Sequence, residues 1–115
     1  MFRLQWTPRA SQQYGDIKAQ AERSLAKRRR SRRSKASPAG GLFNQIHKAL
    51  TLLQANPRHP GLHTHEFHSL THPWDPAGKV FAAYAQNKTP GAYRLFWCYG
   101  PGKRDITILA ITRHP

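Results

Sequence analysis

The strongest constraint on the fold is a pair of apolar runs near the end of the chain, in "GAYRLFWCYGPGKRDITILAITRHP". The runs flank the turn-forming tripeptide "GPG", and apolar runs of this length around such a turn predict a β-hairpin. Arg94 interrupts the first run, and Arg113 and His114 close the second. Because burying an unpaired guanidinium is costly, these cations need an explanation beyond folding.

Upstream of the hairpin, the apolar spacing predicts one strand followed by two helices. "FRLQWTP" alternates apolar and polar residues, which predicts a strand that Pro8 ends. From Ala10 the apolar residues recur every three or four positions, which predicts an amphipathic helix that continues into a basic run. "SPAGG" at residues 37–41 predicts a turn. A second apolar stripe then predicts a helix that stops before Asn56-Pro57, since proline disfavours helix at the preceding residue.

Three further segments complete the expected fold. "LHTHEFHSL" and "VFAAYAQN" predict strands, and "KTPG" predicts a turn before the hairpin. The order is therefore strand, helix, helix and four strands. Helices and strands that fall in separate runs indicate an α+β fold. We expect residues 1–115 to form a single domain, with a helical hairpin on one face of a mostly antiparallel sheet of four or five strands.

The charge balance points to an anionic partner. Nineteen Lys and Arg against five Asp and Glu give a net charge of +14. Such an excess attracts nucleic acids or acidic proteins. The densest part lies within residues 22–41, a basic helix extension or insertion, and we interpret it as a phosphate-binding segment or, alternatively, a solvated helix tip. Its cations are Arg23, Lys27, Arg28, Arg29, Arg30, Arg32, Arg33 and Lys35. Without residues 22–35 the chain keeps eleven cations against four acids, a net +7.

Cysteine usage and the apolar runs predict a cytoplasmic protein. Cys98 is the single cysteine, so an intrachain disulfide is excluded, and its apolar surroundings predict a small buried side chain. The amino terminus lacks the apolar core of a signal peptide, and no run approaches the length needed to span a membrane. No membrane partner is expected.

Four sequence segments together resemble the RelE/ParE-like toxin superfamily of bacterial toxin–antitoxin modules. They are a strand ending in "WTP", the segment "LLQANPRHPGLHTHEF", "AYRLFWCYG" and "ITILAITRHP". The family pattern has a "YR" opening a core strand, then a turn, then a last strand ending in a basic or His-containing pair. The resemblance covers most of the chain, but the basic run between the helices has no counterpart in it.

This resemblance implies two alternative activities and one partner. RelE-like members cut mRNA on the ribosome without a metal, using Lys, Arg, Tyr or His around the scissile phosphate. ParE-like members inhibit DNA gyrase and are not nucleases. Members of both kinds are neutralised by an antitoxin. The resemblance therefore implies an acidic antitoxin partner and an RNA or gyrase target, and a degenerate member without activity is a third alternative.

The resemblance also implies a site at the base of the hairpin. Arg94 matches the strand arginine that contacts phosphate in the nucleases, a task that suits the fixed fork of guanidinium donors. Arg113 and His114 match the terminal pair, as a charge stabiliser and a proton carrier. The alternatives are a solvent-facing Arg94 paired with an acid such as Asp105 or Glu66, and an ordinary mobile basic terminus. Whether Arg94 and Arg113 share a face depends on the hairpin register, because one step reverses the face of every side chain.

Pairing Arg94 with Ile111 would place it beside Arg113, and pairing it with Ala110 would separate them. The family's C-terminal tyrosine is missing here, which leaves Tyr84 as the candidate tyrosine, flanked by the candidate phosphate-binding residues Lys79 and Lys88. The absence of that tyrosine puts cleavage of RNA in question.

Histidine is unusually frequent in the middle of the chain. His63 and His65 are candidates for lining a nucleic-acid groove or serving as the general base. No cysteine or carboxylate pair completes a metal-ligand set with these residues, so no metal is expected, and no phosphate or dinucleotide motif predicts a cofactor. An enzyme of this composition would use cations and imidazole. RNA suits such an enzyme because its 2′-hydroxyl supplies the nucleophile.

Overall fold

We describe residues 1–30, 38–86 and 91–113 of a computed structural model. In chain order the elements are β1 (Arg3–Trp6), α1 (Pro8–Arg30), α2 (Pro38–Ala55), a single 3₁₀ turn η1 (Pro60–Leu62), β2 (His65–Glu66), β3 (Phe81–Tyr84), β4 (Tyr93–Tyr99) and β5 (Asp105–Arg113). This order confirms the predicted α+β fold. The strand expected over "LHTHEFHSL" is shorter than predicted, since only β2 forms there.

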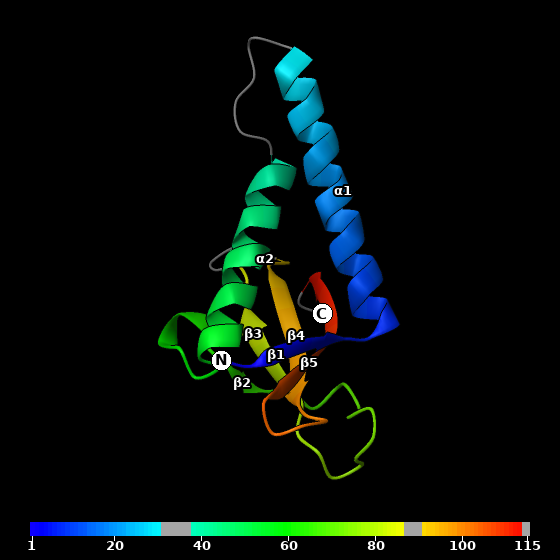
Figure 1. The fold of residues 1–115 in the computed structure, drawn as a ribbon, viewed down its shortest axis with the longest axis vertical. Coiled ribbons are helices and arrows are strands. Elements are labelled where there is room, and N and C mark those ends of the chain that lie inside the picture. The colour runs from blue at the N-terminus through cyan, green and yellow to red at the C-terminus, as the bar shows by residue number, and fades with distance from the viewer. Residues whose placement is uncertain (31–37, 87–90, 114–115) are drawn as a thin grey trace.

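The five strands form one sheet in the order β1-β5-β4-β3-β2. β1 runs parallel to β5, and the other neighbours are antiparallel. Both helices lie on one face of the sheet and project together beyond it, which makes the molecule elongated at 53 × 26 × 25 Å (Figure 1). The mostly antiparallel sheet and the helical hairpin on one face are as predicted.

Prolines begin both helices. Thr7 precedes α1, and its Oγ1 accepts a hydrogen bond of 3.1 Å from the Ala10 N–H, which caps the helix. Pro8 then occupies the first helical position, where its missing N–H costs nothing. The prediction of a turn over residues 37–41 was wrong for its described part, because Pro38 begins α2 in the same way.

Apolar side chains fill both faces of the sheet. The core on the helix side joins α1 and α2 to the strands through the residues Ala10, Ile17, Ile46, Leu50, Leu53, Leu95, Trp97, Ile106, Ile108 and Ile111. A second cluster on the opposite face consists of Val80, Ala82, Phe96, Cys98, Leu109 and Ala110, with Phe67 and Leu70 packed against it. The loop after β2 therefore covers part of the face that the helices leave open.

A β-bulge shifts the register of the central hairpin. Next to the turn, Trp97 pairs with Ile108, but one residue further along, Phe96 pairs with Ala110. Leu109 is the extra residue on β5. Beyond Leu109, each β4 residue pairs with a β5 residue one position later in the chain than the register near the turn would give.

Candidate functional site

Four of the predicted site residues meet around the ring of Tyr84 at one end of β3. The guanidinium carbon of Arg94 lies 3.7 Å from the ring centroid, within cation–π range. The ring centroids of His63 and His65 lie 5.1 and 5.9 Å from that of Tyr84. We call these residues the Tyr84 cluster. Arg94 and Tyr84 are directly opposite each other on β4 and β3, so the backbone pairing holds their side chains together.

Two backbone carbonyls fix the Arg94 guanidinium. Its Nη1 donates to the Gln86 oxygen at 2.8 Å and to the Tyr93 oxygen at 3.2 Å. The Gln86 side chain in turn accepts a hydrogen bond from the Tyr93 N–H at 3.1 Å and donates one to Gln45 on α2 at 3.0 Å. Gln86 is a positioning residue that sequence reasoning missed, and its place just after a strand rich in small residues gave no signal.

Arg94 is buried without a carboxylate. Only 9% of the residue is exposed, and its Nε has no hydrogen-bond acceptor in the described part of the chain. The two acids proposed as alternative partners are engaged elsewhere. Asp105 accepts from Arg3 at 3.0 Å, and Glu66 lies 3.7 Å from Lys79. The alternative of an ion-paired arginine on a solvent-facing sheet is therefore wrong for the described residues.

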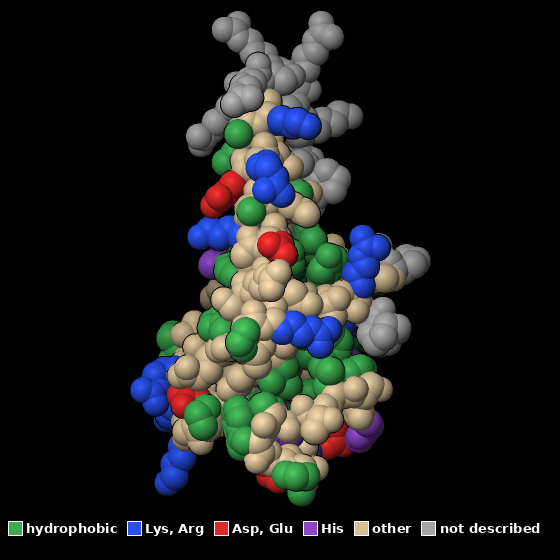
Figure 2. All heavy atoms as spheres, turned by 90° about the vertical axis from the view of Figure 1, so that its right-hand side faces the viewer, with side chains coloured by type: hydrophobic (Ala, Val, Ile, Leu, Met, Phe, Trp, Pro, Cys, Tyr) green, Lys and Arg blue, Asp and Glu red, His purple; other side chains and the backbone are tan. Residues whose placement is uncertain are grey.

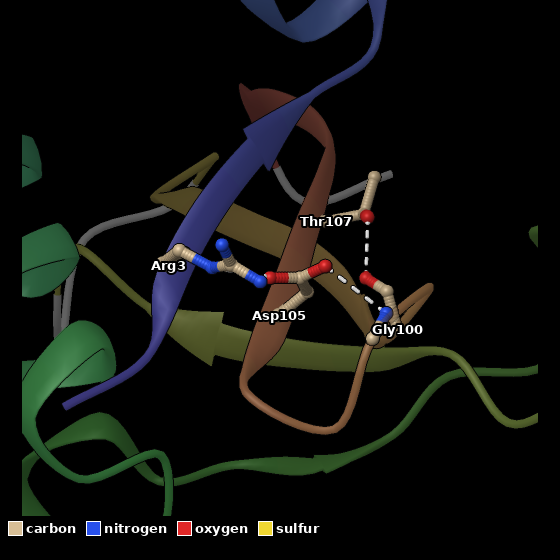
Figure 3. A network of polar contacts seen from close by, with 5 residues as sticks. Arg3, Gly100, Asp105 and Thr107 are labelled. Atoms are coloured by element: carbon tan, nitrogen blue, oxygen red, sulfur yellow. Dashed lines mark hydrogen bonds and ion pairs between the residues drawn. The ribbon is translucent and has the colours of Figure 1, made fainter.

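Asp105 instead organises the turn of the hairpin. Its second carboxylate oxygen accepts from the Gly102 N–H at 3.0 Å, and its backbone carbonyl accepts from the Gly100 N–H at 2.9 Å. Thr107 donates to the Gly100 carbonyl at 2.8 Å (Figure 3). This network lies at the turn end of β4 and β5, whereas Arg94 lies at the other end of β4.

The hydrogen bond of His65 defines which ring nitrogen is basic. Its Nδ1 lies 3.1 Å from the carbonyl oxygen of His63, and a carbonyl oxygen only accepts, so Nδ1 carries the proton. Neutral His65 therefore keeps its lone pair on Nε2, which can accept a proton. His65 has the electronic arrangement of a general base.

His63 adopts a backbone conformation that is uncommon for residues other than glycine. Its φ of 48° and ψ of 40° are left-handed, and it ends η1 by donating its N–H to the Pro60 carbonyl at 3.2 Å. A side chain in this region costs free energy relative to glycine. This conformation places the His63 imidazole against the Tyr84 ring, with ring centroids 5.1 Å apart.

Arg113 does not join the Tyr84 cluster. The observed register pairs Arg94 with Thr112 and Tyr93 with Arg113, rather than Arg94 with Ile111. Arg113 therefore lies on the helix side of the sheet, with its guanidinium carbon 5.9 Å from the Tyr93 ring centroid, whereas Arg94 lies on the opposite side. The condition for a paired Arg94–Arg113 site is not met, so this pairing is corrected. His114 lies outside the described residues.

Two of the predicted phosphate-binding cations that the structure describes, Arg23 and Lys27, belong to α1 rather than to the segments that carry the Tyr84 cluster. Arg23 and Lys27 are exposed on the part of α1 that extends past the sheet. On the face seen in Figure 2, Lys and Arg side chains lie at separate places along the length of the molecule. Arg28, Arg29 and Arg30 belong to the end of α1, but their side chains, together with Arg32, Arg33, Lys35 and Lys88, lie outside what we describe.

Two kinds of feature were not found in the described residues. They contain no group of three or more His, Cys, Asp and Glu side chains close enough to hold a metal ion. The Nδ1 of His72 accepts hydrogen bonds from the Trp74 and Asp75 N–H groups, which helps to shape its own loop. No helix in the described ranges is both long and apolar enough to cross a membrane.

The fold was then compared with known proteins. No protein-family model and no curated protein sequence matches the chain. In structure, the chain is similar to a YoeB/ParE toxin from Agrobacterium tumefaciens, with a TM-score of 0.62 over 98% of this chain and 99% of that one, at 10% sequence identity. The chain has the RelE/ParE-like toxin fold. This confirms the family resemblance at the level of the fold.

Proposed function

We propose that this protein is the toxin of a toxin–antitoxin module and that it binds and cleaves RNA without a metal at the Tyr84 cluster. The observation that carries the proposal is Arg94, a buried guanidinium that no carboxylate neutralises and that stacks on Tyr84 beside two imidazoles. Burying a guanidinium without a carboxylate costs free energy, and binding an anionic ligand would offset that cost. The likeness to a YoeB/ParE toxin supports the toxin class.

The proposed reaction is a transesterification within RNA. His65 Nε2 takes the proton of a ribose 2′-hydroxyl, whose oxygen attacks the adjacent phosphorus. The bond from phosphorus to the 5′-oxygen breaks, and protonated His63 gives that oxygen its proton. The products are a 2′,3′-cyclic phosphate and a 5′-hydroxyl. Arg94 stabilises the charge that builds on the phosphoryl oxygens, and Tyr84 keeps the guanidinium in a fixed plane.

The acidic antitoxin is part of the same proposal. A net charge of +14 with five acids leaves most cations without an intramolecular partner. An acidic protein would neutralise this surface and, by mass action, stabilise the fold that it binds. We expect a small acidic protein encoded beside this chain to suppress its toxicity and to co-purify with it.

A second candidate is a non-catalytic inhibitor of the ParE kind, acting on gyrase or another protein. Two observations favour it: the register separates Arg94 from Arg113, and only 9% of Arg94 is exposed. In this alternative the basic surface docks on a protein target and the Tyr84 cluster only rigidifies the sheet.

Inducible expression in a bacterial host distinguishes the two. For the nuclease, induction should arrest growth and produce transcripts with 2′,3′-cyclic phosphate ends. Arg94→Met and His65→Ala should each abolish both effects. His68→Ala is the matched control, because His68 is an exposed histidine three residues from His65 that does not contact the Tyr84 ring.

Growth arrest with intact transcripts and an induced DNA-damage response would replace the nuclease with the gyrase-type inhibitor. Absence of toxicity from folded, abundant protein would contradict both and leave a degenerate member of the fold.

A further inference from the structure

A pocket lies beside the Tyr84 cluster, on the helix side of the sheet edge. Its volume is about 370 Å³. The lining comes from the segment around η1 and from one face of β3 and β4, and consists of Pro57, Arg58, His59, Pro60, His63, Thr64, Phe81, Trp97 and Tyr99. We call it the edge pocket. His63 belongs to both sites, because it lines the edge pocket and also contacts the Tyr84 ring.

Three aromatic rings form one wall of the edge pocket. The Phe81 and Trp97 rings are stacked, with centroids 4.9 Å apart and planes inclined by 28°. Tyr99 meets the Trp97 ring edge-on at 4.9 Å and is itself 41% exposed. Flat aromatic walls of this kind bind other flat rings, and they do so with little loss of side-chain entropy because the strands already hold them.

Trp97 leaves a hydrogen-bonding group unused. The residue is 1% exposed, and its indole Nε1 has no acceptor in the described part of the chain. A buried indole N–H usually finds a partner, because leaving it without one costs free energy.

The rim of the edge pocket carries one arginine and hydrogen-bonding imidazoles. Arg58 and His63 are exposed there, and none of the lining residues is a carboxylate. His59 Nδ1 accepts from the Gly61 N–H at 3.0 Å, so neutral His59 carries its proton on Nε2 as a donor. A ligand with a flat polar ring and an attached anion matches the aromatic wall and this rim together.

We propose that the edge pocket binds a nucleobase, with the phosphate of the same nucleotide on Arg58. The proposal deepens the proposed function, on which its biological meaning rests. A strand of RNA that crosses the sheet edge at His63 would place one base in the edge pocket and the neighbouring phosphate at the Tyr84 cluster. The edge pocket would then select which base stands next to the cleaved bond.

The test is a titration of the purified full chain with each of the four nucleoside 5′-monophosphates, followed by the indole N–H signals in ¹H–¹⁵N correlation spectra. Trp97→Phe assigns the Trp97 signal, and the indoles of Trp6 and Trp74 serve as internal controls because neither lines the edge pocket. We expect at least one nucleotide to shift the Trp97 signal saturably, and ribose 5-phosphate, which lacks the base, to leave it in place.

Variants locate the site. Arg58→Ala should raise the Kd for that nucleotide about five-fold or more, and Tyr99→Ala about ten-fold. Both positions are exposed, so the variants should fold. Arg9→Ala is the matched control, since Arg9 is an exposed arginine at the start of α1 and does not line the edge pocket; it should leave the Kd unchanged.

Three outcomes would overturn the proposal: no Trp97 shift at millimolar nucleotide, an equal shift with ribose 5-phosphate, or a shift with N-acetyl-tyrosinamide but with no nucleotide. The last would assign the edge pocket to an aromatic side chain of a protein partner. RNA cleavage is measured separately, so cleavage without nucleotide binding removes only this inference, and nucleotide binding without cleavage removes only the proposed nuclease.

Discussion

Two arginines on the same sheet differ both in their exposure to solvent and in whether a carboxylate pairs with them. The Arg3 side chain is 75% exposed, yet it holds a carboxylate, Asp105, at 3.0 Å. Arg94 is 9% exposed and holds none. If carboxylates served to offset the cost of burying a charge, Arg94 would have the carboxylate partner and Arg3 would not, since water already screens the charge of Arg3.

The contrast separates a structural site at Asp105 from the proposed phosphate site at Arg94. Asp105 is buried and also accepts from the Gly102 N–H, so its role is to shape the turn of the hairpin, and Arg3 covers it. Arg94 is held by backbone carbonyls, which orient a guanidinium without neutralising it. An oriented, un-neutralised cation attracts phosphate.

The largest expected effect tests this contrast in activity. Arg94→Met should reduce RNA cleavage at least 100-fold, because the charge on the phosphoryl oxygens loses its stabilising donor. Arg3→Met should leave the cleavage rate unchanged. The measurement is single-turnover cleavage of a defined RNA with equal amounts of folded protein. Equal losses in the two variants would show that net charge alone is responsible.

The second effect tests the contrast in stability. Asp105→Ala should lower the free energy of unfolding by about 1–3 kcal/mol, because the partly buried Gly102 N–H loses its acceptor and Arg3 loses its ion-pair partner. Arg94→Met should change it by less than about 1 kcal/mol, since relief of a buried charge offsets the lost cation–π contact. Urea titrations of both variants give the comparison. A larger loss for Arg94→Met would mean that the arginine is structural.

The third effect separates strain from chemistry at His63. His63→Gly and His63→Ala both remove the imidazole and should reduce cleavage equally. Both variants keep the left-handed backbone, but it is unfavourable only for alanine, whose Cβ crowds the backbone there. His63→Gly should therefore be the more stable of the two by about 1 kcal/mol. Thermal unfolding measures the difference. If the glycine variant is the less stable, the left-handed conformation is not a source of strain.

The smallest effect tests whether the sheet face that carries Arg94 is shielded from solvent. Cys98 lies on the same face of β4 and is fully buried, and burial raises the pKa of its thiol to about 11. About one thiol in a thousand is then ionised at pH 8. Iodoacetamide should therefore modify the native protein negligibly at pH 8 and the urea-unfolded protein completely. Rapid native modification would mean that this face opens.

The same thiol gives a pH dependence with a defined sign. The native state holds the Cys98 proton more tightly than the unfolded state, whose thiol has a pKa near the usual 9. The stabilisation this provides is complete below pH 9 and is lost as the pH rises to about 11. Relative to Cys98→Ala, the wild type should lose stability across that interval, and parallel curves would contradict the raised pKa.

Periodicity predicted α1, β4 and β5, because each of these elements depends on which residues are apolar. The stripe from Ala10 predicted α1, and the two apolar runs predicted β4 and β5. The prediction failed at Pro38, where a turn-forming sequence begins a helix instead. Proline suits both a turn and a first helical turn, so composition alone could not decide between them.

The candidate site was predictable in its members but not in its grouping. Arg94, Tyr84, His63 and His65 were all named from the sequence. Their meeting depends on the pairing of β3 with β4 and on the left-handed bend at His63, which no local pattern records.

The separation of Arg94 from Arg113 depends on a single residue. Near the turn, β4 and β5 keep the register that would have set Arg94 opposite Ile111, and the bulge at Leu109 moves Arg94 to Thr112. A one-residue bulge inside an apolar run leaves no mark in the hydropathy pattern, because the residues on both sides of it are apolar.

The pairing of β1 with β5 has a consequence for when the sheet can form during synthesis. Arg3 and Asp105 are 102 positions apart, and β5 is the strand that joins β1 to β4. During synthesis the sheet cannot close until residues up to Arg113 have emerged from the ribosome, and contacts of such long range form slowly. A nascent chain therefore carries every residue of the Tyr84 cluster before it has the sheet that aligns them. The Tyr84 cluster is therefore held in its final arrangement only late in synthesis, after β5 is complete.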